Sequence, residues 1–371
     1  MSSSHQIILR LLLAIAGAGI GPVAAMGQAS GESAGTSAAD SVRLRVFPLP
    51  VVFYTPETRF AGGASALITH RQPGAERPTA ASVTAIYTQN RQAMLEFSME
   101  GYPGDGAYHY GGRGAHQRFP DVAYALGNRS DPEDREEYTH VGTSFTLDLG
   151  RRVKPGVYAG GGLRVSRDEL TDLEGGGPLS SGALPGAVGG TIWGASGRVT
   201  VDTRDHVFIP SGGALVTLDV RAHPEAMGGD YAFVRYSLDG RRYLLLGSAV
   251  LGFQALLSGT AGEAPFRSLP ALGGPNLLRG YFGGRFRDRN MVVLQSEYRL
   301  PVHRRFGLVA FAGTGQVSSE LSAMRLDGFH AAGGLGFRFL LDPREGVNLR
   351  IDYGLGEGGA SGLYITVTEA F

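Results

Sequence analysis

The 371-residue chain contains no cysteine, which excludes disulfide bonds, thiol nucleophiles and metal sites built on cysteine. It also lacks a charge excess, because 34 Lys and Arg residues balance 34 Asp and Glu residues. The basic footprint of a nucleic-acid-binding protein is therefore missing, and we expect no nucleic-acid partner. Beyond residue 25, no apolar run reaches the roughly 18 residues that a transmembrane helix requires. If the chain crosses a membrane, it must cross with strands.

Glycine, by contrast, is abundant, at 58 of 371 residues. Hydrophobic residues make up 43% of the chain, too many for a disordered protein, while charged residues make up only 18%. This composition predicts many short strands and turns. The motifs of metalloproteases, α/β-hydrolases and P-loop enzymes are missing, so we expect a non-enzyme without catalytic residues, metal or cofactor. A Ser–His–acid group assembled in space would leave no motif, but nothing in the sequence singles one out.

The N-terminal region resembles an export signal. Residues 1–25 combine an early Arg10, an apolar stretch and the small-residue site Val23-Ala24-Ala25, which predicts a secretory signal peptide cut before Met26. An ordinary N-terminal helix is the alternative. Residues 26–47 are predicted to be a flexible linker, because their first two-thirds are rich in Gly, Ala and Ser. The domain that follows is expected over residues 48–371.

Apolar and polar residues alternate with a period of two along most of that domain. In the clearest segment, 347–355, Val, Leu, Ile, Tyr and Leu fall on one face, and Asn, Arg, Asp and Gly fall on the other. A helix would mix these faces, so the pattern predicts a strand. The strand at 121–127 is included partly because a single-chain bacterial barrel requires an even count. The predicted strands lie near 58–70, 80–89, 92–101, 107–117, 121–127, 137–149, 154–168, 191–204, 213–222, 231–240, 243–258, 286–300, 305–316, 328–340, 346–356 and 362–371, about sixteen in all.

The predicted connections differ in length, as is typical of outer-membrane barrels, which have short periplasmic turns and long outer loops. The acidic loop residues are expected either to be solvated or to bind divalent cations that bridge lipopolysaccharide. Short turns are predicted at Asn90-Arg91, Asp239-Gly240 and Asp342-Pro343-Arg344, and longer loops at 71–79, 128–136, 169–190 and 259–285. The acidic loop residues are Asp131, Glu133, Asp134, Glu136 and Glu137.

Alternation alone fits either a soluble β-sandwich or an outer-membrane barrel. The signal peptide, the number of strands and the last residue favour the barrel. The final segment carries Tyr364 and ends on Phe371, which resembles the C-terminal signal of bacterial outer-membrane barrels. Glu369 is expected on the lipid-facing side, near the membrane edge, where a carboxylate costs less. We therefore predict an all-β, transmembrane, antiparallel barrel in the bacterial outer membrane.

One stretch carries a more specific resemblance. Residues 272–300 contain Leu-Gly-Gly, then Leu-Arg-Gly-Tyr, then Gln-Ser-Glu-Tyr-Arg. This order resembles the BamA/TamA family of outer-membrane assembly barrels, also called bacterial surface antigen barrels. The resemblance implies that the sixth extracellular loop folds into the lumen and that its Arg contacts acidic residues on the barrel wall. The loop motif is Leu278, Arg279, Gly280 and Tyr281, and the candidate wall partners are Glu297 and Arg299.

Weaker matches extend the resemblance to roughly residues 48–371. Tyr54-Thr55-Pro56-Glu57 resembles the start of the family's barrel, and Phe119-Pro120-Asp121, with Gly127-Asn128 and Tyr138, resembles another family segment. A further segment resembles the family's Asp-x-Arg-Asp…Pro…Gly periplasmic turn. Its residues are Asp202, Arg204, Asp205 and Pro210, followed by Gly212-Gly213.

Two departures from the family pattern affect the functional interpretation. The family often has an Asp two strands after the motif, which pairs with the loop Arg, but Gly313 occupies that position here. Arg279 must then pair with another acid, for which Glu297 is the candidate, or lose the contact. Family members also carry periplasmic polypeptide-transport domains, and residues 26–57 are too few for one.

By resemblance, we expect a role in inserting or translocating protein or lipid at the outer membrane. The expected partners are outer-membrane lipids and lipopolysaccharide, unfolded barrel clients and a separate periplasmic protein that supplies the missing domains. A weak seam between the first and last strands would template an incoming strand, and Gly62-Gly63 is expected to weaken pairing on the first strand. The alternative is a non-catalytic pore or structural barrel that has lost the assembly role.

Overall fold

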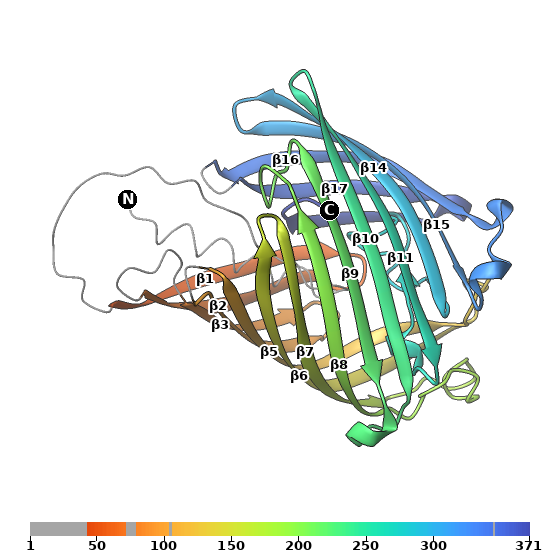
Figure 1. The fold of residues 1–371 in the computed structure, drawn as a ribbon. Helices are drawn as coiled ribbons and strands as arrows, with labels where there is room; N and C mark the ends of the chain where they lie inside the picture. Colours follow the sequence, from red (N-terminus) through yellow and green to blue (C-terminus); the bar gives the residue numbers. More distant parts are fainter. Residues whose placement is uncertain (1–42, 72–78, 104–105, 344–345) are drawn as a thin grey trace.

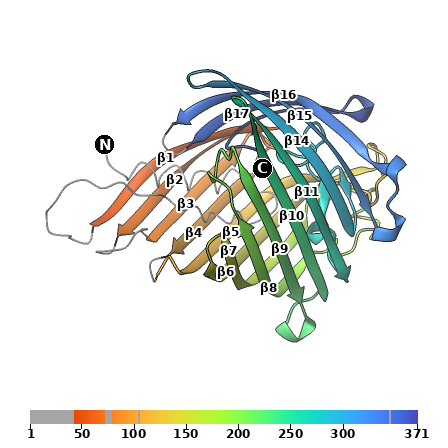
Figure 2. The same cartoon turned by 45° about the horizontal axis from the view of Figure 1, so that its top comes forward.

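The computed structural model describes residues 43–71, 79–103, 106–343 and 346–371. Sixteen strands close an antiparallel barrel, in which each strand pairs with its sequence neighbours and β1 meets β18 (Figures 1 and 2). The all-β fold class is therefore confirmed. The barrel strands are β1 (Arg43–Thr55), β2 (Arg59–Arg71), β3 (Thr79–Thr88), β4 (Ala93–Gly101), β5 (Tyr108–Tyr124), β6 (Arg135–Lys154), β7 (Val157–Thr171), β8 (Gly190–Asp202), β9 (Gly213–His223), β10 (Phe233–Leu246), β11 (Ala249–Gly262), β14 (Asn290–His303), β15 (Phe306–Ser318), β16 (His330–Asp342), β17 (Val347–Gly356) and β18 (Ser361–Val367).

The remaining elements lie in the connections. β12 (Ala271–Leu272) and β13 (Phe286–Arg287) form a separate two-stranded sheet between β11 and β14. Short 3-10 helices occupy other connections. They are η1 (Glu225–Met227), η2 (Phe266–Ser268), η3 (Leu321–Ala323), η4 (Leu326–Gly328) and η5 (Glu357–Gly359). Within the described ranges, no helix is long and apolar enough to cross a membrane.

The predicted count of sixteen strands is confirmed, but two strand assignments were wrong and offset each other. β1 begins at Arg43, inside the predicted linker, so the barrel starts before residue 48. The segments 107–117 and 121–127 form the single strand β5, in which Pro120 sits opposite Thr139 without breaking the ladder. The predicted signal peptide and the linker up to residue 42 lie outside the described residues.

One predicted turn was wrong, and another forms as predicted but not at the expected end of the barrel. Asp239-Gly240 lies inside β10, and the chain turns at Gly247-Ser248 instead. Asn90-Arg91 does form a short turn, between β3 and β4. Since successive connections alternate between the two barrel ends, this turn lies at the end that also carries the long loops 125–134 and 172–189.

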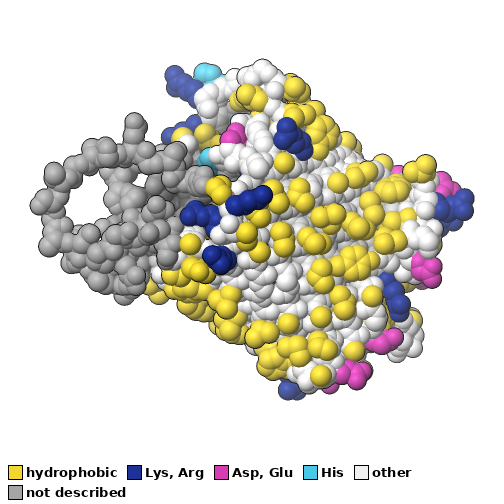
Figure 3. All heavy atoms as spheres, in the orientation of Figure 1, with side chains coloured by type: hydrophobic (Ala, Val, Ile, Leu, Met, Phe, Trp, Pro, Cys, Tyr) yellow, Lys and Arg dark blue, Asp and Glu magenta, His cyan; other side chains and the backbone are white. Residues whose placement is uncertain are grey.

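The barrel has an inverted polarity, with apolar side chains outside and charges inside. In β17, Tyr353 and Leu355 are 52% and 53% exposed, whereas Arg350 and Asp352 are 1% and 0% exposed. Figure 3 shows hydrophobic side chains spread over the strands of one outer face. A wide apolar outer surface on a closed barrel with a charged interior is the arrangement of strands that face lipid.

The loop end of the barrel has a small core of its own, here called the loop-end cluster. It joins strand ends to the loop 172–189 and to the connection after β11, and it comprises Ala123, Tyr138, Leu170, Leu179, Leu184, Ile192, Phe233, Ala264, Phe266 and Leu269. Glu136 anchors the loop 172–189, because its buried carboxylate accepts backbone N–H groups of Leu179 at 2.7 Å and Ser180 at 3.0 Å. Glu136 is therefore not solvated, although neighbouring Glu133 and Glu137 are exposed.

Candidate functional site

The long connection between β11 and β14, residues 263–289, folds into the barrel and is called the inner loop. Its two arms pair as β12 and β13, through Ala271↔Arg287 and Leu272↔Phe286. The tip residues Leu278 and Tyr281 belong to a buried cluster with side chains of β11, β14, β15 and β16. The hairpin therefore carries the tip to the inner wall formed by the last strands.

Glycine allows the tip to touch the wall. Gly280 has a φ of +120°, and a Cβ there would lie 2.7 Å from the backbone carbon of Leu355 on β17. On the wall side, a Cβ at Gly354 would lie 2.6 Å from the backbone of Arg279. No side chain fits at either position, so backbone packs directly on backbone.

Arg279 reaches two acidic residues on the wall. Its Nη2 donates to Glu297 Oε1 on β14 at 2.5 Å, and its Nη1 donates to Asp352 Oδ2 on β17. The guanidinium carbon lies 3.6 Å from the ring centroid of Phe311 on β15, a cation–π distance. Arg279 is only 2% exposed. Its contacts tie the loop tip to three strands at once.

A network of buried charges surrounds this contact. Arg299 lies 2.8 Å from Glu297 Oε2, while Arg338 donates to Asp352 Oδ1 at 2.6 Å and to Glu369 Oε2 at 2.8 Å. With Arg279 and Arg350, four arginines share three carboxylates. Since every arginine has a carboxylate within 4.0 Å, the charges compensate one another locally.

Further hydrogen bonds hold both sides of the tip. Gln295 on β14 donates to the Asn276 carbonyl at 2.8 Å, and Arg350 donates to the Pro275 carbonyl at 3.0 Å. On the other side, Tyr364 of β18 accepts the Gly280 N–H at 3.1 Å and donates to the Tyr281 carbonyl at 3.2 Å. The tip is thus bonded to the last strand of the barrel.

The inner loop also contacts the first hairpin. Glu57, in the turn between β1 and β2, accepts the backbone N–H of Gly283 at 2.6 Å. Burial raises the pKa of Glu57, and the hydrogen bonds from Thr55 and from backbone N–H groups oppose that rise. One loop therefore touches strands on both sides of the junction between β1 and β18.

The structure brings together the loop motif and both predicted wall residues, and it adds one partner that the sequence analysis missed. Arg279 contacts Glu297, and Glu297 also contacts Arg299. Gly313 lies on β15 opposite Gln295 and Ala332 and offers no carboxylate. The second acid is Asp352, which the alternation had placed on the polar face of its strand. Only the three-dimensional register brings it near Arg279.

The C-terminal residues are arranged differently from the prediction. Glu369 is buried against Arg338 and does not face lipid. The reason is local, because β18 ends at Val367 and Thr368 adopts a φ of +70°, which breaks the alternation. Tyr364 and Phe371 are buried as well, and the Phe371 carbonyl accepts Arg299 Nη2 at 2.8 Å. Both aromatic residues of the predicted C-terminal signal therefore point into the barrel.

The predicted turn motif lies between β8 and β9, at the end opposite the long loops, and is not part of this network. Asp202 binds its neighbour Arg204 through two hydrogen bonds of 2.9 Å and 2.8 Å. Asp205 accepts the backbone N–H groups of Ser211 at 2.9 Å and Gly212 at 3.1 Å. Pro210 is buried within the turn. These contacts shape the turn 203–212 itself.

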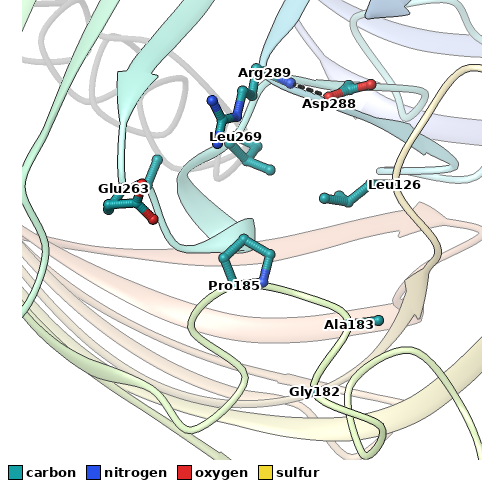
Figure 4. Close-up of a pocket in the computed structure, with 9 residues that line it drawn as sticks. Leu126, Gly182, Ala183, Pro185, Glu263, Leu269, Asp288 and Arg289 are labelled. Atoms are coloured by element: carbon teal, nitrogen blue, oxygen red, sulfur yellow. Dashed lines mark hydrogen bonds between the residues drawn. The ribbon is translucent and has the colours of Figure 1, made fainter. Parts of the chain in front are cut away.

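A cavity of about 360 Å³ opens at the loop end, between the inner loop and the loop 172–189 (Figure 4). Leu126, Pro185 and Leu269 form part of its apolar lining, and Glu263, Asp288 and Arg289 supply charge. Burial raises the pKa of Asp288, whose carboxylate also accepts the Arg289 backbone N–H at 2.7 Å.

The closed sixteen-stranded barrel, with its apolar outer surface and inward-folded loop, defines an outer-membrane β-barrel protein. The Omp85 superfamily domain matches residues 77–356. The chain belongs to the Omp85 superfamily, which confirms the family resemblance and the outer-membrane location.

Solved structures agree on the fold. BamA from Haemophilus ducreyi lacking POTRA domains 1–3 is similar with a TM-score of 0.63 and 14% identity, over 88% of this chain and 70% of that one. CdiB from Acinetobacter baumannii is similar with a TM-score of 0.57 and 15% identity, over 88% of this chain and 60% of that one. CdiB from Escherichia coli gives 0.57 and 12% identity, over 89% and 68%. No curated protein sequence matches this chain.

Proposed function

We propose that this barrel assists the insertion or translocation of protein at the outer membrane, through a seam between β1 and β18. The observation that carries the proposal is the incomplete pairing of these two strands. All residues of the 13-residue β1 pair with β2, but β1 and β18 share only the pair Tyr54↔Ile365. An unpaired strand edge is a template on which another strand can pair.

The sequence of β1 supports this role. Pro48 and Pro50 lie within the strand, and neither has an N–H to donate to a ladder. Proline in sheets is largely confined to edge strands. The glycine pair was expected on the first strand. Gly62 and Gly63 instead lie on β2, where they pair with Val52 and Val51 of β1.

The inner loop provides a means to couple the interior to the seam. Arg279 holds the tip on β14 and β17, Tyr364 bonds it to β18, and Glu57 bonds it to the β1–β2 turn. The loop thus contacts elements on both sides of the junction. We infer that the loop position sets how readily the seam opens.

Disulfide locking tests the proposal. Because the chain contains no native cysteine, an introduced pair of cysteines has no other thiol in the chain to react with. Tyr54→Cys with Ile365→Cys places two thiols on directly opposite residues of the seam. The readout is the rate at which an unfolded client barrel inserts into liposomes that contain the protein. We expect faster insertion than in empty liposomes, loss of that gain on oxidation and recovery on reduction.

The matched control is Leu218→Cys with Leu238→Cys, an outward-facing opposite pair on β9 and β10. Oxidation of this pair should leave insertion unchanged. Arg279→Ala should slow insertion, because the loop tip loses both carboxylate contacts. A locked seam that inserts clients as fast as the reduced protein would contradict the proposal. Steady open conductance without accelerated insertion would favour a pore instead.

A further inference from the structure

A second group of arginines lies on the opposite inner wall, away from the inner-loop network. Arg164 on β7, Arg221 on β9 and Arg235 on β10 project inward, since their neighbours Leu163, Val220 and Val234 are exposed on the outer face. Their side chains are partly accessible to solvent. Water can therefore reach them inside the barrel.

The three arginines lie close enough to repel one another. Arg221 and Arg235 are directly opposite in the β9–β10 ladder, a position in which like charges are destabilising. Arg221 lies close enough to both Arg164 and Arg235 for its charge to act on each of them. The intervening strand β8 carries only Gly194 and Ser196 opposite Arg164 and Arg221. The small side chain of Ser196 leaves room between β7 and β9, whereas the ring of His223 lies over Gly194.

Carboxylates near this group are already engaged elsewhere. Asp219 is held by Arg198, which donates through Nε at 2.9 Å and Nη2 at 2.6 Å. Asp168 lies 2.5 Å from His140 Nε2. In the described part of the chain, no carboxylate forms an ion pair within 4.0 Å of Arg164, Arg221 or Arg235.

The donors of the three guanidinium groups are largely unused. Arg164 makes one long side-chain hydrogen bond, from Nη1 to Thr146 Oγ1 at 3.4 Å. Arg221 Nε is buried without a partner among the described residues. The arginines of the inner-loop network also leave single nitrogens unpaired, but each of those has a carboxylate. Here, among the described residues, no guanidinium group has a carboxylate in direct contact, although Asp168 and Asp219 lie nearby.

We propose that Arg164, Arg221 and Arg235 form a binding site for a phosphate group on the inner wall between β7 and β10. Guanidinium forks match the oxygens of phosphate and bind them through charge-assisted hydrogen bonds. Three cations favour a doubly charged phosphate over a singly charged carboxylate. The phosphate would belong either to a small soluble ion or ester, or to a phosphomonoester group on a lipid.

The test is equilibrium binding of radiolabelled inorganic phosphate to the purified, folded barrel at fixed ionic strength. We expect saturable binding that weakens about tenfold or more in Arg221→Gln and in Arg235→Gln, because each loses charged hydrogen bonds. Arg167→Gln is the matched control. Arg167 lies on β7 as well, but it faces outward and its side chain is 73% exposed, so binding should be unchanged.

A second variant tests the charge argument without touching the site. Arg198→Gln frees Asp219, which can then neutralise Arg221, so phosphate binding should weaken although all three arginines remain. Retained heat-modifiable migration on gels shows that each variant is folded. Unchanged binding in all three variants, or no saturable binding by the native protein, would overturn the proposal.

Competition identifies the source and the class of the ligand. Glycerol phosphate that displaces the label indicates a soluble phosphate ester, and short-chain phosphatidic acid that displaces it more strongly indicates a lipid phosphate. Both results support a phosphate site. Acetate that competes as well as phosphate would refute it, since the site would then not distinguish phosphate from a carboxylate.

Discussion

The two inner walls of the barrel differ in how their arginines are paired. On the β14–β18 side, four arginines share three carboxylates, and the inner loop covers them. On the β7–β10 side, three arginines face the interior and, among the described residues, have no carboxylate within 4.0 Å. Because an ion is stable away from bulk water only when it is paired or hydrated, the first wall can stay dry and fixed. The second requires water or an anion.

The largest effect should come from removing an acid of the paired wall. Glu297→Gln leaves Arg279 and Arg299 with fewer counter-charges in a buried site, and we expect a loss of about 3 kcal/mol in unfolding free energy. Urea unfolding followed by the fluorescence of Trp193, the single tryptophan, measures it. The control Glu169→Gln breaks an exposed pair with Arg167 and should cost less than about 0.5 kcal/mol. Equal losses in the two variants would show that the buried network contributes no more to the unfolding free energy than an exposed ion pair does.

The sequence anticipated one side of this contrast better than the other. Alternation predicted the barrel, and the loop motif led to Arg279 and Glu297. The sequence analysis missed Asp352 as a partner of Arg279. β14 and β17 are three strands apart around the wall, and only closure of the barrel brings them to one loop tip. The sequence analysis did not predict β1, because Pro48 and Pro50 interrupt its strand pattern. Proline is nevertheless tolerated at a poorly paired edge.

The sequence analysis also did not predict the group of unpaired arginines on the β7–β10 wall, for a different reason. Each of Arg164, Arg221 and Arg235 looks like an ordinary interior charge within its own strand. Whether such a charge is compensated depends on the neighbouring strands, and here the nearby acids Asp219 and Asp168 pair with Arg198 and His140. That competition between partners is invisible without the register of β6 to β10.

A smaller effect, of opposite sign, is expected on this unpaired wall. Arg221→Gln removes one member of a like-charged opposite pair, so stability without phosphate should be unchanged or rise by up to about 1 kcal/mol. The same urea titration measures it, next to Glu297→Gln. A loss of more than about 1 kcal/mol would mean that Arg221 has a stabilising partner, and the contrast between the walls would fail.

The smallest effect concerns a carboxylate outside both walls. In Asp205, burial raises the pKa, but the hydrogen bonds from Ser211 and the Gly212 backbone lower it more, so the net pKa lies below 3.8. A lowered pKa means that the carboxylate stabilises the turn above about pH 4 and that this contribution is lost as the pH falls through the lowered value.

Asp205→Asn should therefore weaken the turn 203–212 at neutral pH by about 0.5 kcal/mol, a small value because the side chain is exposed to solvent. Hydrogen exchange at the Ser211 and Gly212 amides should speed up two- to threefold, which is that free energy expressed as a rate ratio. The Thr203 amide, bonded to the Ala214 carbonyl at 2.8 Å, serves as the reference. As the pH falls through the lowered pKa, the difference between the two proteins should shrink, because the native Asp205 becomes protonated as well. A difference that stays constant down to the lowest pH at which the barrel remains folded would show that the hydrogen bonds of the turn do not depend on the carboxylate charge.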